Sequence, residues 1–256
     1  MSDGRLRRLI DLRCEDENTA VAWLEDDFHH FGVTLIHDGH TVRDVRGAAL
    51  RYPWSSCPGA TAPLSALIGQ PLIHRASDVG KRLEMRLQCT HLFDLVGLAL
   101  AQAALRREHR RYEIIVEDPQ IMAWDEVRDR PSSLGPSTAT LSRDGAEVMH
   151  WELQGQTITA PAAYAGQSLQ RGFREWTEAM PEQEAEYATV LRRAVMVSFG
   201  RLMQMGRFPT AACVGMPAAC HSYQPGQRER ALNTSHLQKD YARSGEGMLS
   251  QLARIP

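Results

Sequence analysis

The stretch LQCTHLFDLVGLALAQAAL, Leu87–Leu105, decides the fold, because beyond His91 it is apolar on every side except at Asp94 and Gln102. A helix that is hydrophobic all round is buried in a core. The chain has 256 residues, which is long enough to bury one. The stretch therefore predicts a central helix, and other parts of the chain must cover it.

Strand patterns occur on both sides of this helix in the sequence. Before it, two alternating limbs flank Asp38-Gly39, a hairpin turn signal, because Gly accepts a positive φ. After it, YEIIVED (112–118) and the segment 138–160 alternate in the same way. The fold class expected is α+β, with antiparallel strands in two groups curved around the central apolar helix.

Three further helices are expected. Pro63–Ile68 predicts a short one, and Ser168–Met180 and Glu182–Met205 predict two longer ones. Pro181 is typical of the first turn of a helix, and Gly206 is typical of a C-terminal cap.

The segment 130–137 has the most loop-like composition in the chain, because Pro, Ser and Gly dominate it. It is short. We therefore expect a single domain, 1–256, with two lobes at about 1–130 and 137–256.

Whole-chain properties exclude several classes of protein. The net charge of −2 offers no field for nucleic acid or anionic lipid, and the N-terminus lacks the apolar core of a signal peptide. The longest apolar run is about half of the ~20 residues that span a bilayer. Reduced thiols in a cytoplasmic protein suit the five cysteines, which lack CxxC spacing and lie at positions 14, 57, 89, 213 and 220.

The start of the central helix carries the strongest chemical signal. Thr90 is expected to be the N-cap, and His91 and Asp94, three residues apart, lie on one side of the helix. A buried Asp needs a partner, and a His oriented by an Asp is the usual arrangement of a general base. The helix N-terminus would also lower the pKa of Cys89. The alternative is ordinary packing, in which the Thr caps the helix and the His satisfies a carbonyl.

Other segments offer partners for this helix start. In FHHFGV, His29 and His30 face opposite sides of their strand, so that at most one of them faces a given pocket. An Arg beside aromatic residues suits recognition of a carboxylate or a ring. The remaining substrate-binding candidates are Arg51, Tyr52, Trp54, Thr90 and Tyr164. The alternative is that Tyr52 and Trp54 only plug the sheet edge.

A metal site is the second chemical possibility. Cys57, Cys89, His91 and His29 are ligand types that zinc takes in tetrahedral sets. The chain has none of the strong zinc spacings, and it also lacks the motifs of dinucleotide-binding proteins, P-loop NTPases and α/β-hydrolases. No cofactor is therefore expected.

The motif QCTHLFDL resembles a bacterial family that is classed only as a domain of unknown function. The stretches DDFHHFGVTLIHDG, LRYPWSSCPGA, TATLSRDG, APAAYAGQSL and LRRAVMVSFGR are similar to others in that family, so the resemblance extends from about Arg5 to CHSYQP. It implies no activity beyond a loose association with the catabolism of aromatic or other hydrophobic compounds. It adds weight to the residues Cys89, Thr90, His91, Asp94, His30, Arg51 and Cys57.

The leading hypothesis is a cofactor-independent lyase, dehydratase or isomerase acting on a small apolar or aromatic hydroxyl or carbonyl compound. His91, held by Asp94, shuttles the proton, and His30 is a second acid or base. Arg51 binds a substrate oxygen, while Tyr52, Trp54 and Tyr164 shape the pocket. One alternative is a metal-dependent hydrolase. The other is a non-catalytic module that binds a small molecule or a partner, and a homodimer is the oligomer that an exposed apolar helix face would favour.

Overall fold

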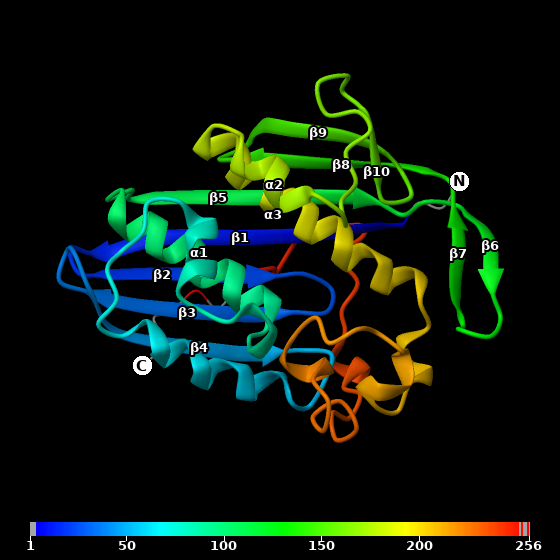
Figure 1. The fold of residues 1–256 in the computed structure, drawn as a ribbon, viewed down its shortest axis with the longest axis horizontal. Coiled ribbons are helices and arrows are strands. Elements are labelled where there is room, and N and C mark those ends of the chain that lie inside the picture. Colours follow the sequence, from blue (N-terminus) through cyan, green and yellow to red (C-terminus); the bar gives the residue numbers. More distant parts are fainter. Residues whose placement is uncertain (1–3, 251, 253–254, 256) are drawn as a thin grey trace. The chain divides into compact units, whose positions relative to one another are not determined.

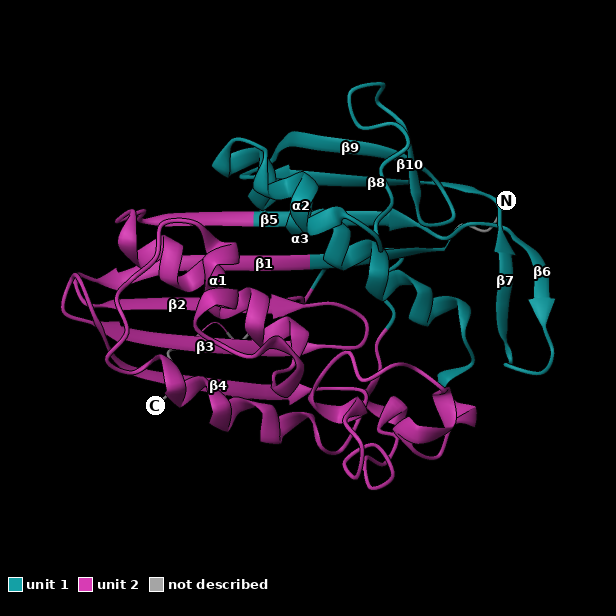
Figure 2. Ribbon diagram, in the orientation of Figure 1, with its two compact units in different colours: residues 1–8, 112–205, 240–246 teal, residues 9–111, 206–239, 247–256 magenta. Residues whose placement is uncertain are grey.

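The structure is a computed structural model that describes residues 4–250, 252 and 255. Its contacts divide the chain into two compact units, shown in Figure 2, each assembled from three separate segments. Unit 1 comprises the described residues of 1–8, 112–205 and 240–246, and unit 2 comprises those of 9–111, 206–239 and 247–256.

Unit 2 is built on an antiparallel meander, drawn in blue in Figure 1. Its strands are β1 (Arg5–Asp16), β2 (Thr19–Glu25), β3 (His30–His37) and β4 (Val42–Arg51). The residues of β1 before Leu9 belong to unit 1. The hairpin predicted at Asp38-Gly39 is confirmed: Gly39 has a φ of 91°, and Oδ1 of Asp38 accepts from the amides of His40 and Thr41. Those amides lower the pKa of Asp38 to about 2.

The predicted central helix is α1 (Thr90–Ala104), and it packs against β2 and β3. Phe31, Val33 and Leu35 alternate along β3 and are fully buried. Gly97 permits a close approach, because a Cβ there would lie 2.5 Å from the carbonyl oxygen of Ala76. The helix is buried along both flanks from His91 to Ala103, with only Asp94 less deeply buried, so the prediction of a core helix is confirmed.

Short 3-10 helices complete unit 2, and one of them replaces the helix predicted at Pro63–Ile68. They are η1 (Cys57–Leu67), η2 (Ala76–Lys81), η3 (Met85–Leu87), η6 (Ala211–Val214), η7 (His221–Tyr223) and η8 (Ser235–Leu237). A further 3-10 helix, η5 (Met205–Arg207), has its first residue in unit 1 and the others in unit 2. Pro58 and Pro63 lack the amide hydrogen that a regular α-helix would use, which suits η1 to the short hydrogen-bonding pattern.

Unit 1 holds a second group of antiparallel strands. They are β5 (His109–Glu117, from Tyr112 onward), β8 (Pro136–Arg143), β9 (Ala146–Gln154) and β10 (Thr157–Ala160), with a small separate sheet of β6 (Ile121–Asp125) and β7 (Arg130–Leu134). The expectation of a loop over 130–137 is wrong, because most of this segment is hydrogen-bonded in β7 and β8. The lobe boundaries proposed from it stay a prediction.

The helices of unit 1 are shorter than predicted. They are α2 (Phe173–Glu178), α3 (Glu182–Ser198) and η4 (Phe199–Leu202). Pro181 is the N-cap of α3 rather than a residue of its first turn, and Gly206 does not cap it. Glu182 lies in the first turn, where a carboxylate interacts favourably with the helix dipole. The exposed side chain of Arg174 in α2 forms an ion pair with Glu178.

The α+β class is confirmed. The hydrogen-bonded order of the large sheet is β10-β9-β8-β5-β1-β2-β3-β4, and helices pack against its strands in both units. In the described part of the chain, no helix has the length and apolar character needed to cross a membrane.

Candidate functional site

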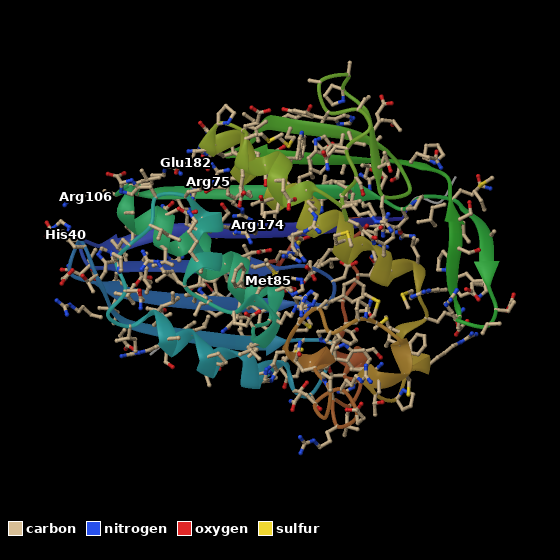
Figure 3. The ribbon with its side chains drawn as sticks, in the orientation of Figure 1. His40, Arg75, Met85, Arg106, Arg174 and Glu182 are labelled. Atoms are coloured by element: carbon tan, nitrogen blue, oxygen red, sulfur yellow. The ribbon has the colours of Figure 1, made fainter. Side chains whose placement is uncertain are left out.

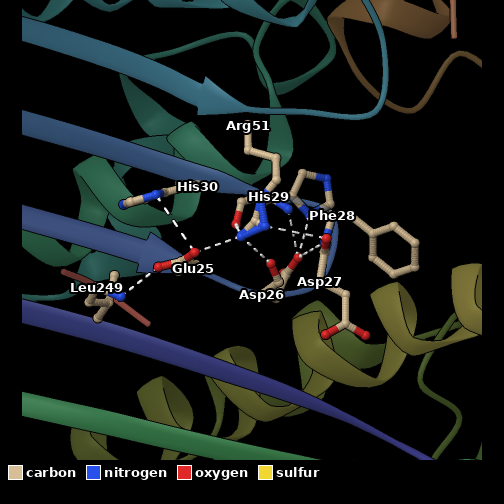
Figure 4. A network of polar contacts seen from close by, with 8 residues as sticks. All are labelled: Glu25, Asp26, Asp27, Phe28, His29, His30, Arg51 and Leu249. Atoms are coloured by element: carbon tan, nitrogen blue, oxygen red, sulfur yellow. Dashed lines mark hydrogen bonds and ion pairs between the residues drawn. The ribbon is translucent and has the colours of Figure 1, made fainter. Parts of the chain in front are cut away.

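The turn between β2 and β3 concentrates acidic and imidazole side chains in the interior of unit 2. Its sequence is EDDFHH, Glu25–His30, and all six residues are buried (Figure 4). Asp and Glu are almost never fully buried unless they are paired. The contacts of this turn therefore decide what it can do.

Asp26 orients His29. The Oδ1 atom of Asp26 accepts hydrogen bonds from the amides of Phe28 (2.8 Å) and His29 (2.9 Å) and lies 2.9 Å from His29 Nδ1. The carboxyl group has no exposed surface. A carboxylate that holds the Nδ1 proton leaves Nε2 as the basic nitrogen of the ring. Sequence reasoning missed Asp26, although the Asp-x-x-His spacing at a strand end was available as a signal.

The ring of His29 lies against the ring of His91 at the start of α1. Their centroids are 3.8 Å apart with an interplanar angle of 31°. Phe31 stacks near both imidazoles, at 5.6 Å from His29 and 6.0 Å from His91. On the other side, Nδ1 of His91 lies 3.6 Å from the Sγ atom of Cys89. The structure thus brings together a buried carboxylate, two imidazoles and a thiol.

The pairing of His91 with Asp94 stays a prediction, since the contacts described for His91 are those to Cys89, His29 and Phe31. The expectation that Thr90 is the N-cap is wrong. Cys89 occupies that position, with extended backbone angles and no side-chain capping bond. Thr90 is the first helical residue, and its side chain is half-buried.

Arg51 holds the turn in place. Its Nη2 atom donates to Glu25 Oε1 (2.7 Å) and to the carbonyl of Asp26 (2.8 Å), and its Nη1 atom donates to the carbonyl of Asp27 (3.4 Å). Glu25 also accepts from the amide of Leu249. These contacts give Arg51 a structural role, and its predicted contact with a substrate oxygen stays a prediction.

His30 belongs to the Glu25 group and not to the His29 group. Its Nδ1 atom lies 3.8 Å from Glu25 Oε1, and its ring meets Trp23 edge-on at 5.3 Å. Burial lowers the pKa of His30, although Glu25 opposes this effect. Among the described residues, none bonds to the buried Nε2 atom of His30.

The side chains of Cys57 and Cys89 are buried, and burial disfavours the thiolate form of each. Burial raises the pKa of Cys57 to about 11, although its bond to Ser222 Oγ at 3.3 Å opposes the change. Burial also raises the pKa of Cys89. The expectation that the helix start lowers the pKa of Cys89 is wrong, because desolvation of the thiolate outweighs the favourable backbone amides.

The geometry does not form the predicted tetrahedral metal set. In the part of the chain that the structure describes, no group of three or more His, Cys, Asp or Glu side chains is arranged to hold a metal ion. His29 and His91 lie ring against ring, whereas zinc ligands direct their lone pairs at one point.

The aromatic candidates fall into two places. Trp54 is buried, and its Nε1 atom donates to the hydroxyl of Tyr223 at 3.2 Å, while the half-buried Tyr52 accepts from Thr234 through its carbonyl. Tyr164 belongs to unit 1, where its hydroxyl donates to Glu184 and its pKa is raised to about 12, mainly by desolvation. Its part in a pocket stays a prediction.

The segment from Cys220 to Tyr223 contacts two of the predicted site residues, and the sequence did not predict these contacts. It follows no periodic pattern, yet Ser222 contacts Cys57 and Tyr223 contacts Trp54. Beside it, the buried Oε1 atom of Gln88 receives no hydrogen bond from the described residues. The backbone carbonyl of Gln88 accepts from the amide of His221 at 2.9 Å.

Comparison with known proteins finds a family match for one part of the chain. Residues 8–106 match the family model described as "Protein of unknown function (DUF2889)". No curated protein matches the chain. The matched segment contains the β2–β3 turn, Arg51 and the start of α1, and so it includes the Asp26–His29–His91–Cys89 cluster. The expected resemblance to a family without an established activity is therefore confirmed over residues 8–106.

Proposed function

We propose that the protein is a cofactor-independent acid–base enzyme of the lyase, dehydratase or isomerase type, working in the cytoplasm on a small apolar or aromatic hydroxyl or carbonyl compound. The observation that supports this most directly is the Asp26–His29 hydrogen bond of 2.9 Å, with the His29 ring placed against His91. An imidazole oriented by a carboxylate is the usual form of a general base.

In this proposal His29 removes a proton from the substrate through Nε2. His91 is the second acid or base, and it exchanges a proton with another atom of the substrate. Histidine suits both steps, because its ordinary pKa lies near neutral pH. Asp26 is a positioning residue, which fixes the tautomer of His29 and stabilises the imidazolium that forms. His29 therefore has the proton-transfer role that was expected of His91, and Asp26 has the orienting role that was expected of Asp94.

The apolar surroundings support an apolar or aromatic substrate. Phe28 meets His29 edge-on at 6.1 Å, and Phe31 stacks on the other imidazole. His29 and His91 keep 7% and 9% of their surface exposed, whereas Asp26 has none. Aromatic side chains beside a few convergent polar groups are typical of small-molecule sites.

The test is exchange and turnover of a panel of aromatic alcohols and carbonyl compounds in heavy water. We expect His29→Gln and Asp26→Asn to lower kcat/KM by ~10²-fold or more, with little change in thermal stability. The matched control is His40→Gln, an exposed histidine of the same unit on the β3–β4 turn (Figure 3). Equal turnover by His29→Gln and the control would refute the proposal. Ligand binding without any product would favour the binding module instead.

A further inference from the structure

A short segment of the C-terminal third, Cys220–Gln224, docks on two buried cysteines of unit 2. Ser222 Oγ lies 3.3 Å from Cys57 Sγ and accepts from Ser56 Oγ at 2.9 Å. The amide of His221 donates to the carbonyl of Gln88 at 2.9 Å. Cys220 and Cys89 are the immediate neighbours of the two residues joined by this last bond, so the backbone brings them close together.

The side chain of Gln224 fixes this arrangement. Its Nε2 atom donates to the carbonyl of Arg86 at 2.8 Å and to that of Cys220 at 3.2 Å. One amide group thus ties the chain before Cys89 to Cys220 itself. Cys57, Cys89 and Cys220 are all thiols in this structure, and each lies near enough to the others to affect their ionisation.

The three thiols differ in access and in their neighbours. Cys220 is half-buried, whereas Cys57 and Cys89 are each 6% exposed. Cys57 is engaged with Ser222. Cys89 faces an imidazole, with His91 Nδ1 at 3.6 Å from its sulfur. Because burial keeps Cys89 protonated, the thiol needs a base in contact with it before it can act as a nucleophile.

We propose that Cys220 and Cys89 form a reversible disulfide when hydrogen peroxide oxidises the protein. The sulfur of Cys220 attacks a peroxide oxygen, the O–O bond breaks, water leaves, and Cys220 becomes a sulfenic acid. Cys89 then gives its proton to His91, and its sulfur attacks the Cys220 sulfur. The S–O bond breaks, and the departing hydroxide takes the proton and leaves as water. Two thiols are oxidised, and one peroxide is reduced to two waters.

The bridge would tie the docked segment covalently to the N-cap residue of α1, two residues before His91. It would also occupy the sulfur that now contacts the His91 ring. The disulfide is therefore a modification of the cluster's surroundings, and it requires no particular reaction at His29.

The test uses the full chain, reduced with a dithiol, freed from it and treated with hydrogen peroxide. After the remaining thiols are alkylated, digestion without reduction and mass spectrometry should find the Cys89 peptide linked to the Cys220 peptide, lighter by two hydrogens and released by dithiol. Cys220→Ser should abolish the link. The control Cys213→Ser, which removes an exposed thiol from the preceding helix η6, should leave it intact.

Two more measurements keep the proposal open to refutation if a cysteine variant folds poorly. Cys89→Ala should leave a sulfenic acid on Cys220 that a 1,3-diketone traps, and His91→Gln should slow formation of the link without slowing oxidation of Cys220. A bridge from Cys220 to Cys57 or Cys213, or oxidation of Cys220 to sulfinic acid with no link in the unsubstituted protein, would overturn the proposal.

Discussion

Replacing Arg51 tests whether the β2–β3 turn depends on the buried ion pair. In Arg51→Met, the carboxylate of Glu25 loses its 2.7 Å partner in a place where only 2% of its side chain is exposed. The carbonyls of Asp26 and Asp27 lose donors at the same time. Leu249 still donates to Glu25, and His30 lies 3.8 Å away, but neither replaces the charge-assisted hydrogen bond from the guanidinium.

Removing one partner of a buried pair costs about 3–5 kcal/mol, because the remaining charge is buried without compensation. For a protein of this size each kcal/mol lowers the melting temperature by roughly 2–4 °C. We therefore expect Arg51→Met to melt about 6–20 °C below the unsubstituted protein. The double variant Glu25→Met with Arg51→Met should regain much of this loss, because no charge is then left in the interior.

The assay is thermal unfolding followed by circular dichroism, with urea unfolding as a second measure. Arg43→Met is the control, because its partner Asp38 lies on the exposed turn and 62% of the Arg43 side chain is exposed. We expect no measurable shift there. If Arg51→Met melts like the control, or if the double variant is less stable than the single one, the assignment of Arg51 as the support of this turn is wrong.

Three other outcomes are expected. Gly97→Ala should lose about 1–3 kcal/mol of stability, because its Cβ would meet the carbonyl of Ala76, whereas Gly80→Ala, whose Cβ has an ordinary 3.6 Å contact, should lose less; urea unfolding measures both. Burial lowers the pKa of His30 and His37 in the folded state. The stability that they contribute is therefore complete above their unfolded pKa of about 6.5, and it is lost as the pH falls through the folded value. Melting temperatures measured across that range should decline toward acid, and the decline should be smaller in His37→Gln. Chelator treatment should leave the melting temperature unchanged, and elemental mass spectrometry should find less than about a tenth of a metal per chain; a tightly held metal would bring back the hydrolase hypothesis.

The parts of the fold that the sequence predicted are those with local and periodic causes. The apolar run of Leu87–Leu105 predicted α1, since only burial explains a helix without a polar face. The hairpin at Asp38-Gly39 followed from the positive φ that Gly accepts. The segment 130–137 misled because Pro and Ser are read as loop formers, yet β7 is an edge strand of a two-stranded sheet, where Pro is tolerated.

The sequence predicted which residues take part in the candidate site, but it did not predict which of them contact one another. His29, His91 and Cys89 were all singled out, and the structure places them in one cluster. Their carboxylate is Asp26 and not a helical neighbour. Spacing within a helix can be worked out from the sequence, whereas the bonds of a turn depend on backbone angles that sequence alone does not give. Cys220 was not predicted for the same reason, because it lies in an irregular segment whose backbone angles the sequence does not give.

The EDDFHH turn places the carboxylate of the proposed general base close to a separate, structural ion pair. Glu25 and His30 are paired across β2 and β3, and the same register places Arg51 opposite His30, so the three side chains share one face of the sheet. Asp26 and His29 lie between these paired residues, and their side chains bond to each other while His29 meets α1. The arginine joins the two groups, since it binds the Glu25 carboxylate and the carbonyls that precede His29. The charge that stabilises the turn is thus separate from the carboxylate that orients His29, so the proposed function predicts that Asp26→Asn lowers activity while Arg51 still stabilises the turn.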